Sequence, residues 1–348
     1  MPTFTFEQIR GVAVQVFAAL GCPPDEAEIV GDALARANLA GHDSHGIIRV
    51  EQYARLVKEG SIVPGGPTTT ERETACTALL DGGWNFGQVV ARRAVELGIR
   101  KAREYGSGTI SVKQSNHLGR LGEYTLMAAQ EGMLCTATVN NHGRGNLVAP
   151  FGGSDGRLAT NPISFACPGP DRPIVVDITT SVVAEGKVRI LKNAGKQAPE
   201  GWLIDSNGNP TTDPQDLYGP PPGAILPFGG AVGHKGFALS VMVDILSGAL
   251  SGAGCSHSST CRLGNAMFFH ILDPEKFVTR DEYDHWVSTL QTHIKGSPPA
   301  PGFSEILMPG EPEFRTEERR RRDGIPVDNV TWQQFKACAA GIGVQFEL

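Results

Sequence analysis

The first sixty residues follow the pattern of amphipathic helices. After the capping-box pattern Thr5-x-x-Gln8, apolar residues recur with a helical period and predict a helix that ends at Gly21. A second apolar stripe predicts a helix that ends at Gly41, and a third helix is expected over residues 46–59. A Pro- and Gly-rich breaker follows the third helix. The chain is therefore expected to begin with a helical region.

Helices and short β-rich runs alternate in the middle of the chain. Helices are expected at residues 87–104 and 121–131, and strands at residues 108–112, 134–139, 163–166 and 174–178. The strand, helix and strand between residues 108 and 139 predict a βαβ unit whose two strands are parallel neighbours. This alternation is typical of the α/β fold class.

A long apolar segment stands out in the second half of the chain. Residues 237–250 contain few polar residues on any face of a helix, which predicts that the helix is buried. Pro- and Gly-rich stretches at residues 219–233 and 296–312 predict long loops. The helix is thus expected to lie inside the molecule, between two loop regions.

Composition and charge exclude several classes of protein. The chain has 348 residues, of which 40% are hydrophobic and 20% charged, as in globular proteins. The net charge of −6 provides no basic field for nucleic acid, and the run Arg319–Arg322 beside acidic residues is expected to form a solvated helix face. No apolar run is long enough to span a membrane. The opening residues show no secretory signal, so a cytoplasmic location is expected.

The cysteines indicate neither disulfides nor zinc. There are seven, an odd number, and none forms a Cys-x-x-Cys pair or a zinc-type Cys/His spacing. We expect reduced thiols and no metal site.

The common nucleotide-binding motifs are absent. The sequence contains no Gly-x-Gly-x-x-Gly after a strand and no P-loop, so a conventional Rossmann domain is not expected. The one Gly-x-Ser-x-Gly string, at residues 152–156, follows Pro150 rather than a buried strand and is interpreted as a turn.

A first polar histidine cluster lies between two predicted helices, at Gly41-His42-Asp43-Ser44-His45-Gly46. Arg49 follows His45 by four residues, so the two side chains are expected to share a helix face. A guanidinium can hold a substrate carboxylate while an imidazole protonates the alkoxide that develops beside it. The pattern favours chemistry on a carbonyl next to a carboxylate. The alternative is that Asp43 or His45 only caps the third helix.

Two further polar segments follow predicted strands. Ser115-Asn116-His117-Leu118-Gly119 follows one strand, and Asn140-Asn141-His142-Gly143 follows the next. Ligands gather at the carboxyl ends of parallel strands, so His117 and Asn141 are expected to face one crevice. The alternative is that Asn and Gly only form turns there.

A third segment, Gly233-His234-Lys235-Gly236, comes just before the apolar helix. Lysine at a helix N-terminus, where backbone N–H groups lack partners, is typical of an anion site and would suit a cofactor pyrophosphate. The alternative is a lysine on an exposed turn.

Taken in order, these motifs resemble one family, the malate/L-lactate dehydrogenases that lack a Rossmann fold. Its members include ureidoglycolate, sulfolactate and diketogulonate oxidoreductases and Δ1-piperideine-2-carboxylate reductases. The resemblance extends over nearly the whole chain. It rests on Gly41–Gly46 with Arg49, Asn116–Arg120, Ala159–Ser164, Val176-Asp177, Gly186-Lys187, Pro199–Trp202 with Asp205, Gly208 and Thr212–Pro214, His234–Gly236, and Gly248–Gly252.

The resemblance implies a homodimer that transfers a hydride between NAD or NADP and a small 2-oxo or 2-hydroxy acid. Each protomer would have a non-Rossmann α/β cofactor domain, residues 71–312, and a helical domain on the substrate side, residues 1–70 joined by 313–348. His45 would be the proton donor and His117 a second catalytic histidine, with Ser44 and Arg49 on the substrate side. Cofactor contacts would come from Asn141, Pro173, Val175, Asp177, Thr179, His234, Lys235, Gly310, Glu311 and Pro312.

Two departures from the family pattern concern the cofactor. Glu185 stands where many members have Arg, and Ala231-Val232 lengthen the loop before His234. A carboxylate would repel a 2′-phosphate, which favours NAD slightly over NADP. Two alternatives remain for the function: a reductase of a cyclic imine acid, and a catalytically silent relative that only binds a small acid.

Overall fold

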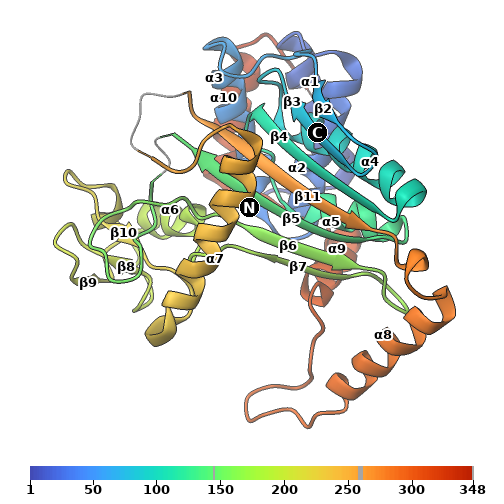
Figure 1. Cartoon of the computed structure of the whole chain (residues 1–348). Coiled ribbons are helices and arrows are strands. Elements are labelled where there is room, and N and C mark those ends of the chain that lie inside the picture. Colours follow the sequence, from blue (N-terminus) through green and yellow to red (C-terminus); the bar gives the residue numbers. More distant parts are fainter. Residues whose placement is uncertain (144–145, 258–261, 347–348) are drawn as a thin grey trace.

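A mixed seven-stranded sheet forms the centre of the molecule (Figure 1). The computed structural model describes residues 1–143, 146–257 and 262–346. The strands, in sheet order, are β2 (Thr69–Glu73), β3 (Thr77–Asp81), β4 (Ser107–Ser115), β11 (Gly264–Leu272), β5 (Leu134–His142), β6 (Ile163–Cys167) and β7 (Ile174–Ile178). β3 and β4 pair in parallel, and the other neighbours pair antiparallel. The α/β fold class is confirmed.

The predicted pairing of the two central strands is wrong. β4 and β5 run in the same direction, but β11 lies between them and is antiparallel to both. Periodicity reports local structure only, and β11 comes from much later in the chain. Asn265 at the start of β11 is nevertheless opposite both Ser115 and Asn141, so β4 and β5 end at the same edge of the sheet.

Helices cover both faces of the sheet. α4 (Gly87–Tyr105) and α5 (Gly122–Gln130) cover one face, where Ala137 and Val139 of β5 join their core. α7 (His234–Asp244) and its continuation over Ile245–Ala249 cover the other face. There Thr138 Oγ1 lies 2.8 Å from Ser247 Oγ. The alternation of side chains along β5 therefore separates an apolar face from a polar one.

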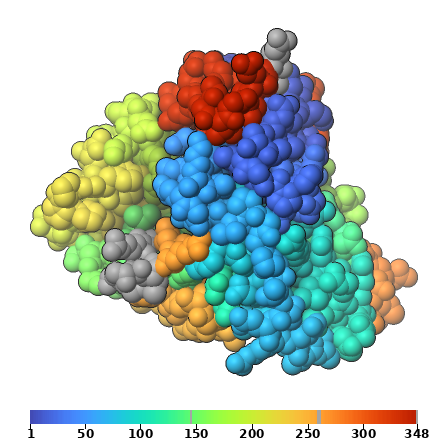
Figure 2. All heavy atoms as spheres, turned by 90° about the horizontal axis from the view of Figure 1, so that it is seen from above, coloured from blue at the N-terminus to red at the C-terminus, as the bar shows by residue number. Residues whose placement is uncertain are grey.

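The N-terminal helices share a core with the end of the chain. α1 (Phe6–Ala19), α2 (Pro24–Leu39) and α3 (Arg49–Lys58) pack with α10 (Asn329–Ala340), and β1 (Thr3–Phe4) pairs with β12 (Ile325–Pro326). Figure 2 shows the two ends of the chain side by side. The capping box at Thr5 is confirmed. The division into domains near residues 70 and 313 stays a prediction.

Two parts extend from this body (Figure 1). One is a small lobe with α6 (Glu185–Asn193) and a sheet of β10 (Ala224–Ile225), β8 (Leu203–Ile204) and β9 (Pro210–Thr211). The other is α8 (Arg280–Lys295), which has no buried residue and is followed at some distance by α9 (Glu311–Asp323). Among the described residues, no helix combines the length and hydropathy needed to cross a membrane.

The apolar helix over residues 237–250 is not buried as predicted. The positions of α7 and its continuation that face the sheet are mostly small or polar: Ser240, Val243, Asp244, Ser247 and Gly248. The large apolar side chains on the outer face are 40–56% exposed: Leu239, Met242, Ile245 and Leu250. The prediction failed because the inward face packs through polar contacts, such as Asp244 with Asn140, rather than through the large side chains.

Candidate active site

The segment Gly41–Gly46, which we call the histidine turn, connects α2 to α3. Its residues Asp43–His45 form a short 3₁₀ helix, and α3 begins only at Arg49. His45 and Arg49 therefore do not share the face of one α-helix, contrary to the prediction. They are linked instead through the backbone, since Arg49 Nε donates to Ser44 O at 2.6 Å.

The histidine turn is tied to the end of α2 by one side chain. Asn38 is buried, its Nδ2 donates to Asp43 Oδ1 at 2.7 Å, and its Oδ1 accepts from the backbone N–H of Ile47 at 2.7 Å. Gly41 has φ +88°, a left-handed conformation that glycine adopts without strain. The chain can thus reverse sharply and present Ser44 and His45 to one side.

His45 and His117 stack on each other. Their ring centroids are 5.6 Å apart and the ring planes differ by 14°. His117 comes from the loop after β4, so residues far apart in sequence form a pair of imidazoles. Ser44 Oγ lies 3.0 Å from His45 Nδ1. The structure therefore brings Ser44, His45, Arg49 and His117 together at one place.

Tyr53 on α3 contacts His117 and was not among the predicted site residues. The Tyr53 hydroxyl lies 2.6 Å from His117 Nδ1, and Gln88 Nε2 donates to the same hydroxyl at 2.9 Å. We infer that the phenol donates to Nδ1, because its buried O–H needs an acceptor and its other neighbour, Gln88 Nε2, is itself a donor. The neutral His117 then carries its proton on Nε2. The available signal was that a buried tyrosine needs a partner for its O–H.

Arg49 has two of its nitrogens engaged within the protein. Nε binds Ser44 O, and Nη1 donates to Gln52 Oε1 at 2.7 Å. Nη2 has no hydrogen bond to any residue in the described ranges. This end of the guanidinium can bind the carboxylate of a small acid.

Both imidazoles are held in the neutral form. Burial, followed by the positive charges of Arg49, His42 and Arg120, lowers the pKa of His45 to about 3. Burial, followed by Arg49 and His45, lowers the pKa of His117 well below its usual value. An anion bound at Arg49 would offset this charge and raise both pKa values.

Arg120 lies between this pair and the predicted cofactor strand. It is buried, its Nε has no hydrogen-bond partner among the described residues, and Nε is 3.5 Å from Asp177 Oδ2 on β7. The same Asp177 oxygen accepts from the backbone N–H of Gly122 at 2.8 Å. The guanidinium is thus a buried cation with donor capacity left over, beside both His45 and β7.

Seven of the ten residues predicted to contact the cofactor lie in two segments that meet each other. Pro173, Val175, Asp177 and Thr179 lie on or beside β7, and Gly310, Glu311 and Pro312 lie at the start of α9. These segments meet, since a Cβ on Gly310 would lie 3.2 Å from that of Val175. Thr179 bonds to the backbone of Ser181, and Glu311 pairs with Lys295.

The other predicted cofactor residues lie apart from the histidine pair. His234 and Lys235 are exposed at the first positions of α7, where the ring of His234 meets Phe151 edge-on. Asn141 lies on β5 opposite Asn265. In the described part of the chain, these three side chains form no hydrogen bond or ion pair with His45 or His117.

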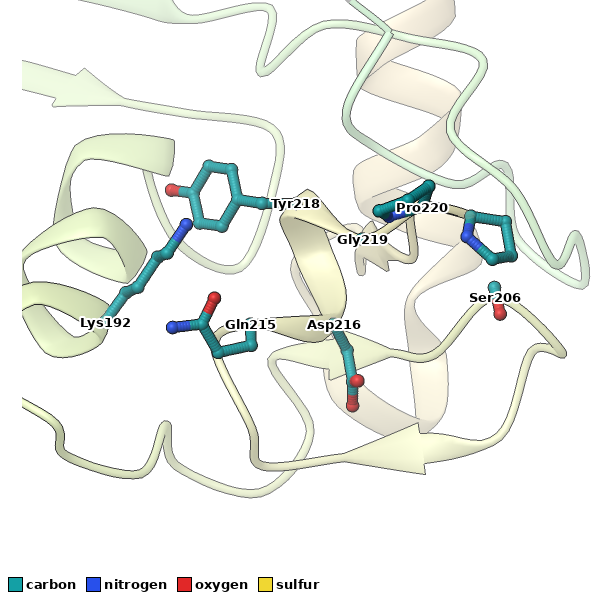
Figure 3. Close-up of a pocket in the computed structure, with 8 residues that line it drawn as sticks. Lys192, Ser206, Gln215, Asp216, Tyr218, Gly219 and Pro220 are labelled. Carbon is teal, nitrogen blue, oxygen red and sulfur yellow. The ribbon is translucent and has the colours of Figure 1, made fainter.

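A shallow pocket in the small lobe is lined by residues such as Lys192, Gln215, Asp216 and Tyr218 and by neither histidine (Figure 3). Lys192 and Tyr218 point toward each other there, with Nζ 4.2 Å from the ring centroid. The Tyr218 hydroxyl donates to Glu185, which also pairs with Arg189 at 2.9 Å. The carboxylate that was expected to disfavour NADP is therefore paired with a cation.

The cysteines among the described residues form no disulfide bonds. Six cysteines are free, and Cys261 lies outside the described residues. The described ranges contain no group of His, Cys, Asp and Glu arranged to hold a metal ion.

Comparison with known proteins gives consistent matches over the full chain. Residues 4–336 match the model of the family described as malate/L-lactate dehydrogenase. The chain is 39% identical to a malate dehydrogenase of Pyrococcus horikoshii, over 97% of this chain and 95% of the relative. It is 35% identical to an L-lactate dehydrogenase of Cupriavidus necator, over 96% of each. The solved structure of malate dehydrogenase from Pyrococcus horikoshii superposes with a TM-score of 0.90 at 36% identity, covering 99% and 96% of the two chains.

Proposed function

The chain belongs to the malate/L-lactate dehydrogenase family of NAD(P)-dependent 2-hydroxyacid dehydrogenases, and we propose that its reaction takes place at His45 and His117 on a small 2-oxo or 2-hydroxy acid. The observation that carries this proposal is the stacked, half-buried histidine pair with the free Nη2 end of Arg49 beside it. The relatives named above are malate and lactate dehydrogenases, so acids of that size are the first to test.

The family uses a nicotinamide cofactor, and the residues present fit one. Arg120 is a buried guanidinium whose Nε is 3.5 Å from Asp177 but has no hydrogen-bond partner among the described residues, and Lys235 adds a second positive charge at the N-terminus of α7. We propose that these cations hold the phosphates and that β7 with Gly310 lines the site. When bound, the nicotinamide supplies or accepts the hydride.

The side chains around the reacting carbon would orient the acid and move the proton. Arg49 Nη2 binds the carboxylate and fixes the carbonyl against the imidazoles. His45 delivers a proton to the carbonyl oxygen through Nε2, because its Nδ1 faces Ser44. His117, with its proton held on Nε2 by Tyr53, donates a hydrogen bond to the same oxygen. Proton delivery of this kind contributes about 10²–10⁴-fold to a rate.

The charge around the histidines links substrate binding to proton uptake. In the free protein the pKa of His45 is about 3, so the imidazole starts without the proton that it must deliver. The carboxylate of the bound acid offsets Arg49, which raises the pKa of His45. In the oxidation direction the neutral imidazole is already the form that accepts a proton.

The test is oxidation of NADH and NADPH in the presence of pyruvate or oxaloacetate, each with and without methylamine. We expect cofactor oxidation with a 2-oxo acid alone. Turnover that requires the amine would indicate an imine reductase instead. Cofactor binding without turnover of any acid would indicate a silent binding protein.

For the cofactor, we propose a small preference for NAD. The carboxylate of Glu185 disfavours a 2′-phosphate, but its pairing with Arg189 reduces this effect. Fluorescence titration of NADH and NADPH should give dissociation constants within about tenfold of each other, with NADH the tighter, since 1.4 kcal/mol corresponds to a factor of ten.

We also propose that the chain forms a homodimer through α7. The support is the outer face of this helix, where Leu239, Met242, Ile245 and Leu250 are exposed although the inner face is small or polar. A contiguous row of exposed large apolar side chains is typical of a surface that contacts another protein.

A further inference from the structure

Helix α9 lies against the histidine turn along one of its faces. Glu313, Thr316 and Arg320 occur three and four residues apart and so share that face. Each contacts a different one of the first three residues of the turn. Glu313 pairs with His42 at 3.5 Å, and a Cβ on Gly41 would lie 3.0 Å from Thr316 Cγ2. Arg320 binds Asp43.

The Arg320 contact is the strongest of the three. Its guanidinium grips Asp43 with two hydrogen bonds, from Nη1 to Oδ1 at 2.6 Å and from Nη2 to Oδ2 at 2.9 Å. Nη1 also donates to the backbone carbonyl of Asn38. The side chain is only 12% exposed. Arg320 is thus largely shielded from solvent and anchored to another element, so the prediction that the run Arg319–Arg322 is a solvated face is wrong at this residue, although the other three arginines are exposed as predicted.

The neighbouring arginines of this run do not share the arrangement. Arg321 pairs with Glu317 one turn earlier on its own helix, and Arg322 pairs with the adjacent Asp323. Both are about half exposed or more. Of these three arginines, Arg320 is the one with a bidentate contact to a residue outside its own helix. That residue, Asp43, is two positions before His45.

We propose that Arg320 is a positioning residue for the reaction at His45: by clamping Asp43 it holds the histidine turn where the imidazole meets the substrate. This rests on the proposed role of His45. Arg320 itself touches neither histidine in the described structure. Its effect would come through geometry, and a displacement of about 1 Å at a reacting group can cost about 10²-fold in rate. A planar guanidinium suits this role because its two nitrogens fix the orientation of the carboxylate.

The test compares Arg320→Met and Arg320→Lys with the matched control Arg321→Met. We expect Arg320→Met to lower kcat by about 10- to 100-fold. KM for the oxo acid should change less than about threefold, since Arg49 is intact. Arg320→Lys should recover part of kcat, because lysine keeps the positive charge but cannot make the two parallel hydrogen bonds of a guanidinium. Arg321→Met should match the wild type. Asp43→Asn should resemble Arg320→Met, and the double variant should lose no more than either single one.

A second readout does not depend on activity. Hydrogen exchange followed by mass spectrometry should show faster exchange of the peptide over residues 41–48 in Arg320→Met than in Arg321→Met. If the wild type reduces no oxo acid but residues 41–48 still exchange faster in Arg320→Met, then Arg320 does hold the histidine turn and the proposed function is wrong. Wild-type kcat in a folded Arg320→Met, or additive losses in the double variant, would overturn the proposal.

Discussion

Tyr53 decides which nitrogen of His117 carries the proton. We infer that the phenol, which accepts from Gln88 and needs an acceptor for its own O–H, donates to Nδ1 and leaves the proton of the imidazole on Nε2. Because Tyr53 is fully buried, this arrangement has no competition from water. The second histidine is thus oriented by a side chain on α3, the same helix that begins with Arg49.

We therefore expect Tyr53→Phe to fold but to lose activity. The ring volume is kept, whereas His117 is free to adopt the other tautomer and to rotate. The expected loss in kcat is about tenfold or more, a part of the 10²–10⁴-fold that a proton-transfer group contributes. Steady-state kinetics at several pH values would show it, with exposed Tyr105→Phe as the control. Unchanged kcat would mean that Tyr53 only fills space.

The low pKa of His45 makes the fold sensitive to acid. The pKa of His45 is about 3 in the folded chain and about 6.5 in an unfolded one. Between these values the unfolded state binds more protons, so stability falls as the pH falls. At about 1.4 kcal/mol per pH unit, this one group lowers the free energy of unfolding by roughly 2 kcal/mol between pH 7 and pH 5.

His45→Asn should therefore unfold with less dependence on pH than the wild type. The measurement is urea denaturation at pH 7 and pH 5, where the variant should lose about 2 kcal/mol less than the wild type. Exposed His285→Asn serves as the control and should follow the wild type. An equal loss in His45→Asn would show that His45 is not held neutral by burial.

At the scale of elements, α4 presses directly on the loop that carries His117. A Cβ on Gly87, the first residue of α4, would lie 2.2 Å from the carbonyl oxygen of Asn116 and 2.6 Å from the carbonyl carbon of His117. These neighbours are backbone atoms and cannot rotate away. Glycine at this position is therefore what lets the helix support the loop.

Gly87→Ala should displace the His117 loop. We expect a loss of about 1–3 kcal/mol in the free energy of unfolding, as for other overpacked sites, together with reduced kcat. Gly11→Ala is the matched control, because it lies inside α1 with nothing within 4 Å of the added Cβ. It should gain about 0.5–1 kcal/mol from helix propensity. Equal behaviour of the two variants would contradict the proposed contact.

The elements also show which information the sequence contains. Local signals were sufficient for α1 to α5, for most strands near the motifs and for the turn at residues 152–156. Pairing between distant segments was not accessible, and so β11 was absent from the predicted sheet and Arg320 from the predicted anchors. At the histidine turn the residue types were enough to propose the chemistry. Tyr53 was missed because it fits an apolar stripe equally well.

At the scale of the whole molecule, the large apolar side chains of α7 point away from the sheet and are exposed in the single chain. Its inner face is tied to the sheet by polar contacts, with Asp244 accepting from Asn140 at 2.7 Å and Thr138 meeting Ser247 at 2.8 Å. The outer face exposes a row of apolar side chains. Because each of them is about half exposed, burying it in an interface would contribute about 1 kcal/mol. A second copy that offers the same face is the simplest occupant.

Met242→Lys should therefore convert a dimer into a monomer. Met242 is 50% exposed, so lysine can be accommodated in the isolated chain, whereas a two-fold interface would contain the new charge twice. The control is Val330→Lys on α10, where a single apolar side chain is 63% exposed. Sedimentation equilibrium over a range of concentrations should show the wild type and Val330→Lys as dimers and Met242→Lys as a monomer that retains its helix content. A dimer that survives Met242→Lys would place the interface elsewhere, and the exposed Trp286 and Leu290 of α8 would be the next residues to change.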